Sequence, residues 1–213
     1  MTIRLPSVLI CVGVLAAAPA FAQSELDQIP QDEERLERAI EAPPEAPPEV
    51  EESREVRLDR LFARLKVAKT PEQARQISGT IQRELLRSGS PTTDLLMKEA
   101  AAAIESKDLP VALDVLDAVT RLSPDYAEGW NRRATVYFMR EEYGRSLADL
   151  ERTLALEPRH WGAINGLATI LRSLDDTEAA AEAYDRALAI YPLQEQIQKA
   201  RESLHDDVDG EEI

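Results

Sequence analysis

Three evenly spaced prolines constrain the fold of this chain more than any other feature. Pro124 and Pro158 are 34 residues apart, and so are Pro158 and Pro192. Alignment on these prolines gives three units, at residues 93–126, 127–160 and 161–194. Each unit holds an apolar-periodic run, a short polar break, a second such run and the proline, a pattern that predicts helix, turn, helix and stop. Repeats of this length predict an all-α solenoid.

Within the three units, the residue types at matching positions resemble the tetratricopeptide repeat family. A small residue recurs at the eighth and twentieth positions, and a bulky residue recurs at the fourth and twenty-fourth. In unit order these are Leu96, Trp130 and Ile164; Ala100, Ala134 and Ala168; Ala112, Ser146 and Ala180; and Leu116, Leu150 and Tyr184. The resemblance implies a right-handed superhelical solenoid in which small residues let the two helices of a unit approach closely. Trp130 and Trp161 are both expected to pack in the core, although Trp161 stands at a unit boundary. Val119 and Thr153 depart from the usual alanine of the family and put local packing in question.

Helical segments flank the repeats. Residues 55–92 are expected to form a diverged N-terminal helical hairpin, acting either as a cap or as a degenerate fourth unit. Within this hairpin, Thr70 is typical of an N-cap, with Pro71 at the first helical position and Gln73 three residues on. Gly89 and Pro91 are expected to stop its second helix. Residues 195–204 are predicted to be a capping helix, and residues 205–213 an acidic disordered tail rather than a calcium loop.

Residues 1–22 have the pattern of a signal peptide. Arg4 precedes an uncharged run over 8–18. Small residues, Ala20 and Ala22, stand at the two positions that a signal peptidase reads. The apolar run is shorter than the roughly 20 residues that a membrane-spanning helix needs. A lipid anchor at Cys11 is disfavoured because Ile10 precedes it. Cleavage before Gln23 would leave no integral membrane segment and predicts a periplasmic or secreted protein.

The composition after this segment is strongly acidic. Residues 23–54 are predicted to be an acidic, proline-rich, disordered leader, since acidic residues outnumber basic ones twelve to three over 23–55. A short helix over 31–40, used for oligomerisation, is the alternative. Without Arg4 the chain carries 24 basic and 40 acidic residues, a net charge of −16. This charge argues against nucleic acid and anionic membranes as partners.

Catalytic and metal-binding motifs are not found in the sequence. Cleavage would remove the single cysteine, Cys11, and only two histidines, His160 and His205, are present. No glycine-rich phosphate loop precedes a helix. The sequence therefore predicts a non-enzymatic protein with no catalytic residues, no metal site and no cofactor.

The family resemblance implies a concave groove, lined by the first helix of each unit, that binds a protein or peptide partner. The candidate groove residues are Lys98, Asn131, Arg132, Thr135, Asn165, Thr169 and Arg172. Asn131 and Asn165 recur one unit apart and could pair with the backbone of an extended segment, although ordinary solvated polar residues are the alternative. Because this face should be exposed, replacing Asn131 and Arg132 is expected to leave stability nearly unchanged.

Two roles for such a surface remain open. Some members of the family bind chaperone C-termini through a clamp of Lys, Asn and Arg side chains. In this sequence the clamp is absent, because its positions hold Met97, Ala101, Arg132, Gly162 and Gly166. The favoured role is an interaction scaffold or adaptor in the cell envelope that captures an acidic or carboxylate-bearing segment. The alternative is a structural or assembly protein that acts through self-association, and the sequence leaves both the oligomeric state and the partner open.

Overall fold

The computed structural model describes the backbone of residues 52–209 and the side chains as far as Leu204. Nine helices and no strand make up the regular structure of this range, and none of these helices is long and apolar enough to cross a membrane. They are α2 (Arg54–Lys66), α3 (Pro71–Leu85), α4 (Pro91–Glu105), α5 (Leu109–Leu122), α6 (Ala127–Met139), α7 (Tyr143–Leu156), α8 (Trp161–Ser173), α9 (Thr177–Ile190) and α10 (Glu195–Asp209). The predicted signal segment and nearly all of the acidic leader lie outside the described residues.

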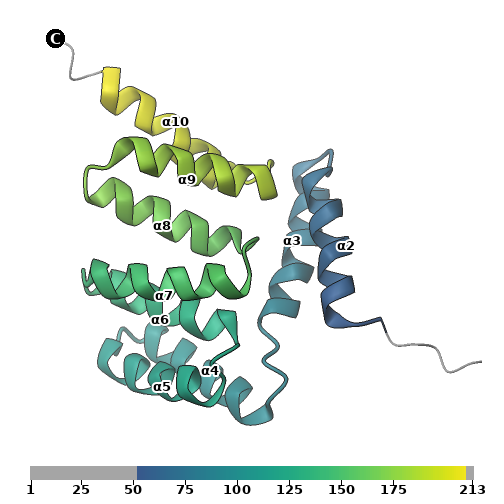
Figure 1. The fold of residues 1–213 in the computed structure, drawn as a ribbon, viewed down its shortest axis with the longest axis vertical. Coiled ribbons are helices and arrows are strands. Elements are labelled where there is room, and N and C mark those ends of the chain that lie inside the picture. The colour runs from purple at the N-terminus through teal and green to yellow at the C-terminus, as the bar shows by residue number, and fades with distance from the viewer. Residues whose placement is uncertain (1–51, 210–213) are drawn as a thin grey trace, which may run out of the picture. The chain divides into compact units, whose positions relative to one another are not determined.

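The pairs α4–α5, α6–α7 and α8–α9 stack on one another, with α10 on α9 (Figure 1). This arrangement confirms the predicted all-α solenoid. The turn inside each pair is the same: Lys107, Glu141 and Asp175 occupy equivalent positions in the three units, and each has φ of 60° or 61°. One left-handed residue per turn therefore reverses the chain at the same place in every repeat.

Close packing of the two helices in a repeat follows the predicted small residues. Ala100, Ala134 and Ala168 are each at most 1% exposed. The Ser146 hydroxyl donates a hydrogen bond of 2.8 Å to the carbonyl oxygen of Ala134, which is possible only because the helices approach closely there. Thr153 is fully buried and donates its hydroxyl to the carbonyl of Asp149 at 2.8 Å. The departure from alanine at this position is therefore accommodated without an unpaired polar group.

The two tryptophans differ in burial, and only Trp161 lies in the core as expected. Trp130 is only half-buried; its indole Nε1 donates to the carbonyl of Pro124 at 3.0 Å, and the Arg133 guanidinium lies 4.8 Å from its ring centroid. Trp161 is 5% exposed and belongs to the largest apolar core. The prediction that Trp130 is a core residue is wrong because the indole nitrogen and the guanidinium draw this ring to the edge of the core.

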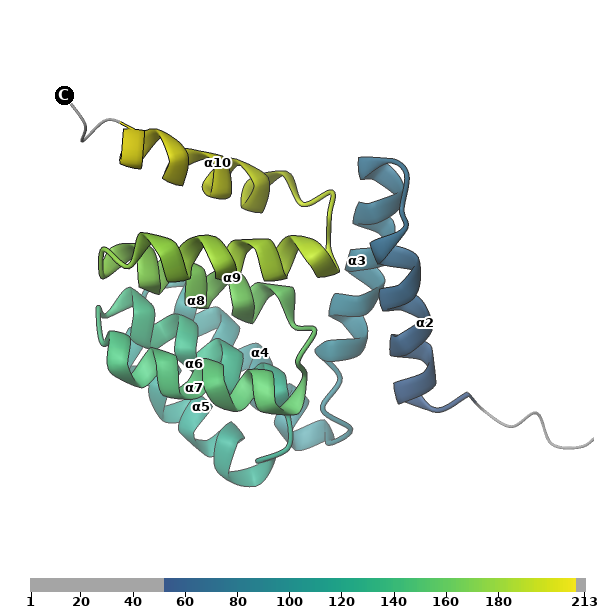
Figure 2. The same cartoon turned by 45° about the horizontal axis from the view of Figure 1, so that its top comes forward.

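The hairpin α2–α3 lies across the ends of the stacked helices instead of extending the stack below α4 (Figures 1 and 2). Its apolar residues share one core with α8, α9 and α10. The Phe62 ring meets Trp161 edge-on at 6.0 Å between centroids, and Trp161 meets Tyr191 at 5.6 Å. Nη1 of Arg159 donates a hydrogen bond of 2.6 Å to Oδ1 of Asp59 in α2. The hairpin therefore packs chiefly on the third repeat, and neither a cap on the first repeat nor a fourth repeat in line describes it.

The connection from α3 to α4 explains this placement. Gly89 has φ of +81°, a left-handed conformation that glycine adopts without strain, and turns the chain between the two helices. The Tyr126 hydroxyl donates to the carbonyl of Leu86 at 2.8 Å and fixes the end of α3 beside the junction of the first two repeats. Tyr126, Trp161 and Tyr191 thus place one aromatic anchor for the hairpin at each of three successive repeat junctions.

One helix end agrees with the sequence predictions and two differ from them. Thr70 caps α3 by accepting from the Gln73 amide at 3.2 Å, as predicted. Pro91, expected to stop α3, is instead the first residue of α4, with Ser90 as N-cap. The last helix, α10, continues through Asp209, into the segment predicted as a disordered tail. No Gly or Pro stands between Leu204 and Gly210 to end it earlier.

Candidate functional site

Four of the predicted groove residues lie together between α6 and α8. Asn131, Thr135, Asn165 and Thr169 line one pocket of about 240 Å³. Gly162 and Gly166 also line it, and Gly166 occupies the repeat position where the first two repeats carry Lys98 and Arg132. The absence of a side chain at Gly166 leaves this part of the surface open.

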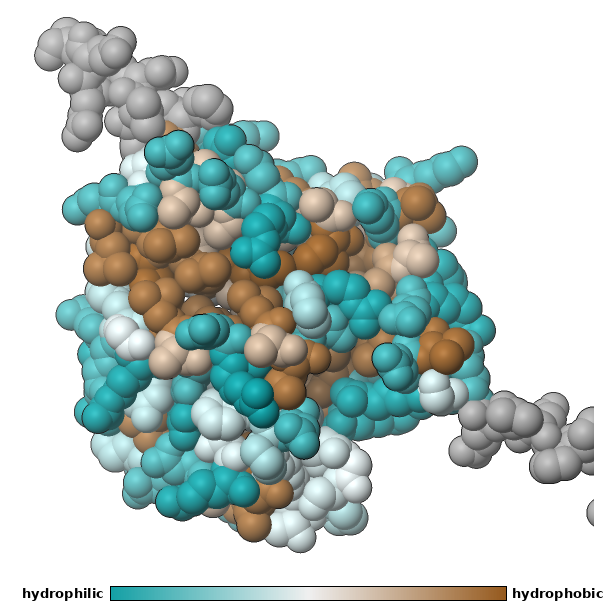
Figure 3. All heavy atoms as spheres, in the orientation of Figure 1, coloured by the Kyte–Doolittle hydropathy of each residue, from teal (hydrophilic) through white to brown (hydrophobic). Residues whose placement is uncertain are grey.

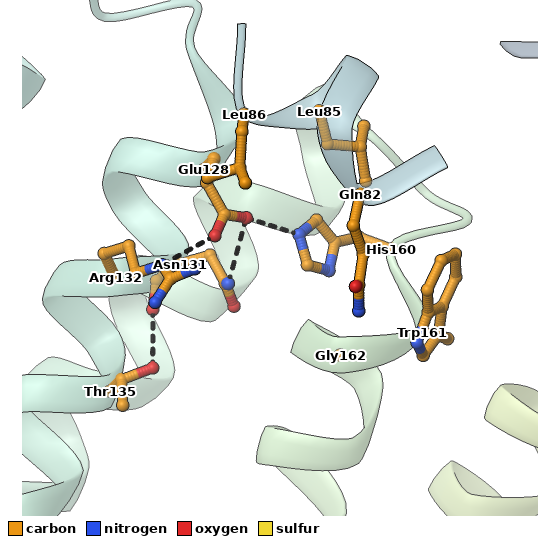
Figure 4. A pocket seen from close by; sticks show the side chains of 10 residues that line it. All are labelled: Gln82, Leu85, Leu86, Glu128, Asn131, Arg132, Thr135, His160, Trp161 and Gly162. Atoms are coloured by element: carbon orange, nitrogen blue, oxygen red, sulfur yellow. Dashed lines mark hydrogen bonds and ion pairs between the residues drawn. The ribbon is translucent and has the colours of Figure 1, made fainter. Parts of the chain in front are cut away.

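A second pocket joins the first through Asn131, Thr135 and Gly162, which line both. It measures about 260 Å³ and opens between α3, α6 and the start of α8 (Figure 4). From α3 and the residue that follows it come Gln82, Leu85 and Leu86. Sequence reasoning missed these three residues because the hairpin was not expected to lie beside the first helices of the repeats.

A third pocket, of about 380 Å³, contains the predicted residue Lys98. Leu86 and Arg132 line both this pocket and the second one, so they stand between the two. The remaining lining residues are Arg87, Asp94, Met97 and Ala101. We call the surface formed by the three connected pockets the groove. The seventh predicted residue, Arg172, is exposed in the last turn of α8 and lines none of these pockets.

A buried carboxylate holds the middle of the groove in place. Glu128 is 6% exposed, and its oxygens accept from Arg132 Nε at 2.7 Å and Asn131 Nδ2 at 3.2 Å. Its Oε2 lies 2.9 Å from Nε2 of His160 (Figure 4). Nδ1 of His160 accepts from the backbone N–H of Ala163 at 3.0 Å and caps α8. This hydrogen-bond pattern assigns the proton of the neutral imidazole to Nε2, which donates to Glu128.

The balance of interactions keeps Glu128 ionised. Burial by itself raises the pKa of Glu128, but the hydrogen bond from His160, together with the charge and hydrogen bond of the Arg132 guanidinium, outweighs burial and holds this pKa below its usual range. Asn131 and Arg132 are therefore partners of a buried charge. Against the expectation from sequence, the structure predicts that replacing both lowers stability, because their loss would leave the buried Glu128 with His160 alone.

The same arrangement turns cations toward the groove. Arg132 uses Nε for Glu128, and within the described part of the chain its two terminal nitrogens make no hydrogen bond. Asp94 accepts from the hydroxyl and the amide of Ser88, which lowers the pKa of its carboxyl. The carboxylates along this surface are thus engaged with neighbouring groups, while Lys98 is exposed. A ligand in the groove would meet ammonium and guanidinium groups first.

In the sequence, His160 stands out only as one of two histidines, too few to form a metal-binding cluster. Its pairing with Glu128 is a contact across 32 residues that no local pattern marks. One signal was available, since both residues stand next to repeat junctions, where the helix ends of adjacent units meet. In the range that the structure describes, no group of three His, Cys, Asp or Glu side chains is placed to hold a metal ion.

Apolar surface lies near the third repeat as well. Figure 3 shows brown, apolar residues gathered at the level of α8 and α9, within a polar rim. Partly buried leucines of this repeat, among them Leu167, Leu171 and Leu188, pack around the large core. Continuous apolar surface of this kind suits contact with another protein.

Comparison with known proteins agrees with this architecture. A tetratricopeptide repeat family model matches residues 131–195. A TPR repeat-containing protein of Rhizobium etli is 45% identical over 152 residues, which cover 70% of this chain and 74% of that protein.

Solved structures share the fold at lower identity. The first TPR of Spaghetti (RPAP3), bound to an HSP90 peptide, aligns with a TM-score of 0.53 and 16% identity over 55% of this chain and 93% of that one. The Thermobaculum terrenum O-GlcNAc transferase aligns with a TM-score of 0.52 and 20% identity over 55% of this chain and 22% of its own. TPR domains generally mediate protein–protein interaction, although some proteins that contain them are enzymes. From its repeats, its helix pairs and its Rhizobium relative, the chain belongs to the tetratricopeptide repeat family.

Proposed function

We propose that this protein is a non-enzymatic interaction scaffold or adaptor of the cell envelope that holds a segment of another protein in the groove. The observation that carries the proposal is the continuity of the three pockets, which run from Lys98 on α4 past Arg132 on α6 to Thr169 on α8. A surface that crosses the first helix of every repeat suits an extended segment better than a small molecule. The peptide in the RPAP3 structure supports such a mode.

The chemistry of the groove favours an acidic or carboxylate-bearing segment. The terminal nitrogens of Arg132 and the ammonium of Lys98 can bind carboxylates through charge-assisted hydrogen bonds. Asn165 offers an amide donor and acceptor to a peptide backbone. On a chain with a net charge of −15, these cations would also select the orientation in which a partner approaches.

Export rests on the sequence of residues 1–22. The basic start, the uncharged run and the small residues before Gln23 suit a signal peptide, which would deliver the protein to the periplasm or beyond. Mass spectrometry of the protein isolated from its own cells tests this point. A mature N-terminus at Gln23 is expected. Recovery of the protein from the cytoplasmic fraction with residues 1–22 still attached would contradict export.

Paired charge variants test the groove. Replacing Lys98→Gln and Asn165→Ala removes two exposed or half-exposed groove side chains that are not partners of Glu128. The matched control, Arg121→Gln with Arg186→Gln, removes exposed charge from the second helices α5 and α9. Co-purification of envelope proteins should fall roughly tenfold for the groove pair and stay unchanged for the control pair. Equal capture by both pairs would place the binding surface elsewhere.

Self-association is the second candidate, and the outer face of the first repeat favours it. Leu95 is 56% exposed, whereas Gly129 and Ala163, at the same position in the later repeats, are buried. A Cβ added at Gly129 would lie 2.7 Å from Val119 of the preceding helix, which shows that this position faces the previous repeat. The hairpin does not cover it on α4.

Light scattering separates the two candidates. Under the adaptor proposal, the chain from Gln23 is monomeric, and Leu95→Glu leaves its mass unchanged. A dimer that Leu95→Glu dissociates would support assembly through this face.

A further inference from the structure

We propose that the groove selects a segment of asymmetric charge, with an aliphatic side chain flanked by carboxylates at the α4 end of the groove and small uncharged residues at its α8 end. The α4 end is the pocket that contains Lys98, and the α8 end is the pocket that contains Thr169. This selectivity rests on the function proposed above and narrows the class of partner. It also makes Leu86, which lies outside the repeats, a specificity-determining residue.

The chemistry of the groove changes from one repeat to the next. Two neighbouring positions of each first helix line the pockets, and their side chains change from apolar and cationic, to polar and cationic, to polar alone. In repeat order these are Met97 and Lys98, Asn131 and Arg132, and Asn165 and Gly166. Positive charge therefore ends before the third repeat, and a segment that crosses all three meets a different surface at each end.

The α4 end joins apolar surface to positive charge. Its apolar lining comes from Leu86, Met97 and Ala101, and its charged lining from Arg87, Asp94, Lys98 and Arg132. Three cations against one carboxylate give this lining a net charge of +2, on a chain whose net charge is −15. An aliphatic side chain can therefore bury itself against the leucine and the methionine while the carboxylates beside it pair with the cations.

Leu86 presents an exposed side chain on a fixed backbone. Its side chain is 41% exposed, so the core does not require it. Its amide donates to the carbonyl of Gln82 at 2.9 Å, and its carbonyl accepts from the Tyr126 hydroxyl at 2.8 Å. Because hydrogen bonds hold the backbone on both sides of this residue, little further ordering is needed when a ligand contacts the side chain.

The α8 end has the opposite character. Among the described residues, no charged side chain lines this pocket. Gly166 has no side chain there, so the backbone of a ligand can approach α8 closely. The Asn165 amide can pair with that backbone but offers no counter-ion to a carboxylate. An acidic residue placed at this end would lose water without gaining a cation, whereas small uncharged residues would not pay that penalty.

Fluorescence anisotropy with labelled synthetic octapeptides and the purified protein tests this selectivity. The clustered probe is Asp-Leu-Glu-Gly-Ser-Ala-Gly-Ser, used also in reverse order so that either direction of binding is sampled. The scrambled probe, Ser-Asp-Gly-Ser-Leu-Gly-Glu-Ala, has the same composition. All probes end in an amide, which removes any terminal carboxylate. The better clustered probe should bind roughly fivefold more tightly than the scrambled one, and equal affinities would overturn the proposal.

Two leucine variants test the assigned role of the hairpin. Leu86→Asp should weaken binding of the clustered probe roughly fivefold, because it replaces apolar lining with a carboxylate that repels the acidic end. The matched control, Leu174→Asp, changes a leucine that is 50% exposed and lines none of the three pockets, and should leave the affinity unchanged. Equal losses for the two variants would contradict the role of Leu86.

Charge reversal separates recognition from misfolding. Lys98→Glu should lose affinity for the clustered probe and should bind a probe with lysines in place of its two acidic residues more tightly than the unaltered protein does. A misfolded protein cannot show this gain, and its absence would overturn the proposal. Octanoate, an aliphatic carboxylate without a peptide backbone, should not displace the clustered probe at equal concentration. Displacement would mean that the pocket takes a small molecule instead of a segment.

The selectivity and the proposed function can fail separately. If the clustered and scrambled probes bind equally while capture of envelope proteins still depends on Lys98 and Asn165, only the selectivity is wrong. If neither the probes nor the captured proteins depend on groove residues, the proposed function is wrong as well.

Discussion

His160 and Glu128 form a buried pair in which Nε2 of the imidazole lies 2.9 Å from a carboxylate oxygen across 32 residues of chain. The pair joins the start of α8 to the start of α6, because the other imidazole nitrogen caps α8 at Ala163. Through Arg132, the same carboxylate also positions a guanidinium at the groove. The packing of the second and third repeats and the chemistry of the groove therefore depend on one cluster.

Removing His160 should destabilise the protein in two separable ways. His160→Ala loses the helix cap and the hydrogen bond to a buried charge, and should lower the free energy of unfolding by about 2 to 4 kcal/mol. His160→Asn can keep the cap but not the contact with Glu128, so its loss should be smaller by about 1 kcal/mol. Urea unfolding of both variants measures the difference. Identical losses would show that the cap contributes nothing.

The ionised state of Glu128 predicts a pH dependence. Because its pKa is lowered in the folded state, the unfolded chain binds more protons at acidic pH. The stability contributed by this group is complete above the pKa of the unfolded chain and is lost as pH falls below about 5. Glu128→Gln, which cannot titrate, should show a shallower loss of stability between about pH 5 and 3. Parallel slopes for the two proteins would mean that Glu128 is not held ionised by its partners.

The two tryptophans should respond differently to truncation. Trp161→Ala removes a buried ring from the core shared by the hairpin and the third repeat, and should cost about 3 to 5 kcal/mol. Trp130→Ala should cost clearly less, about 1 to 2 kcal/mol, because its ring is half-buried. Denaturant unfolding compares them. A larger loss for Trp130 would mean that the hairpin does not dock on Trp161.

Glycine at a left-handed turn position should stabilise the solenoid. Lys107 has φ of 61°, a conformation that costs a residue with a Cβ about 1 to 2 kcal/mol. Glycine would remove this cost, but its greater entropy in the unfolded chain offsets part of the benefit. Lys107→Gly should therefore raise the free energy of unfolding by about 0.5 to 1 kcal/mol. The control Glu105→Gly, inside the end of α4, should instead cost about 0.5 to 1 kcal/mol. Thermal melts that shift both variants downward would contradict the turn assignment.

The sequence predicts the repeats because their signals are local. Proline spacing, alternating small and large residues, and caps such as Thr70 all act within one unit or one turn. The position of the hairpin depends instead on contacts between distant residues, such as Phe62 with Trp161 and Ser78 with Tyr191. No periodicity marks such partners, although aromatic residues at the repeat junctions were a usable hint.

The sequence predicts only part of the candidate groove, because some of its residues depend on contacts between distant parts of the chain. Residues on the first helices, such as Asn131 and Thr169, follow from their position in the repeat. The wall formed by Gln82 and Leu86 follows from the docking of the hairpin, and the dual role of Arg132 follows from the burial of Glu128. These features appear only when separate elements of the chain are brought together.

Site-specific photo-crosslinking in native cells tests most directly whether the groove is the binding surface. A photoreactive residue placed at Thr135 or Thr169 would face the groove, and one placed at Arg121 or Arg186 would lie on the exposed second helices α5 and α9. A crosslinked partner protein is expected from both groove positions and none from the two control positions. A partner captured only from Arg121 or Arg186 would contradict the claim that this protein works through its groove.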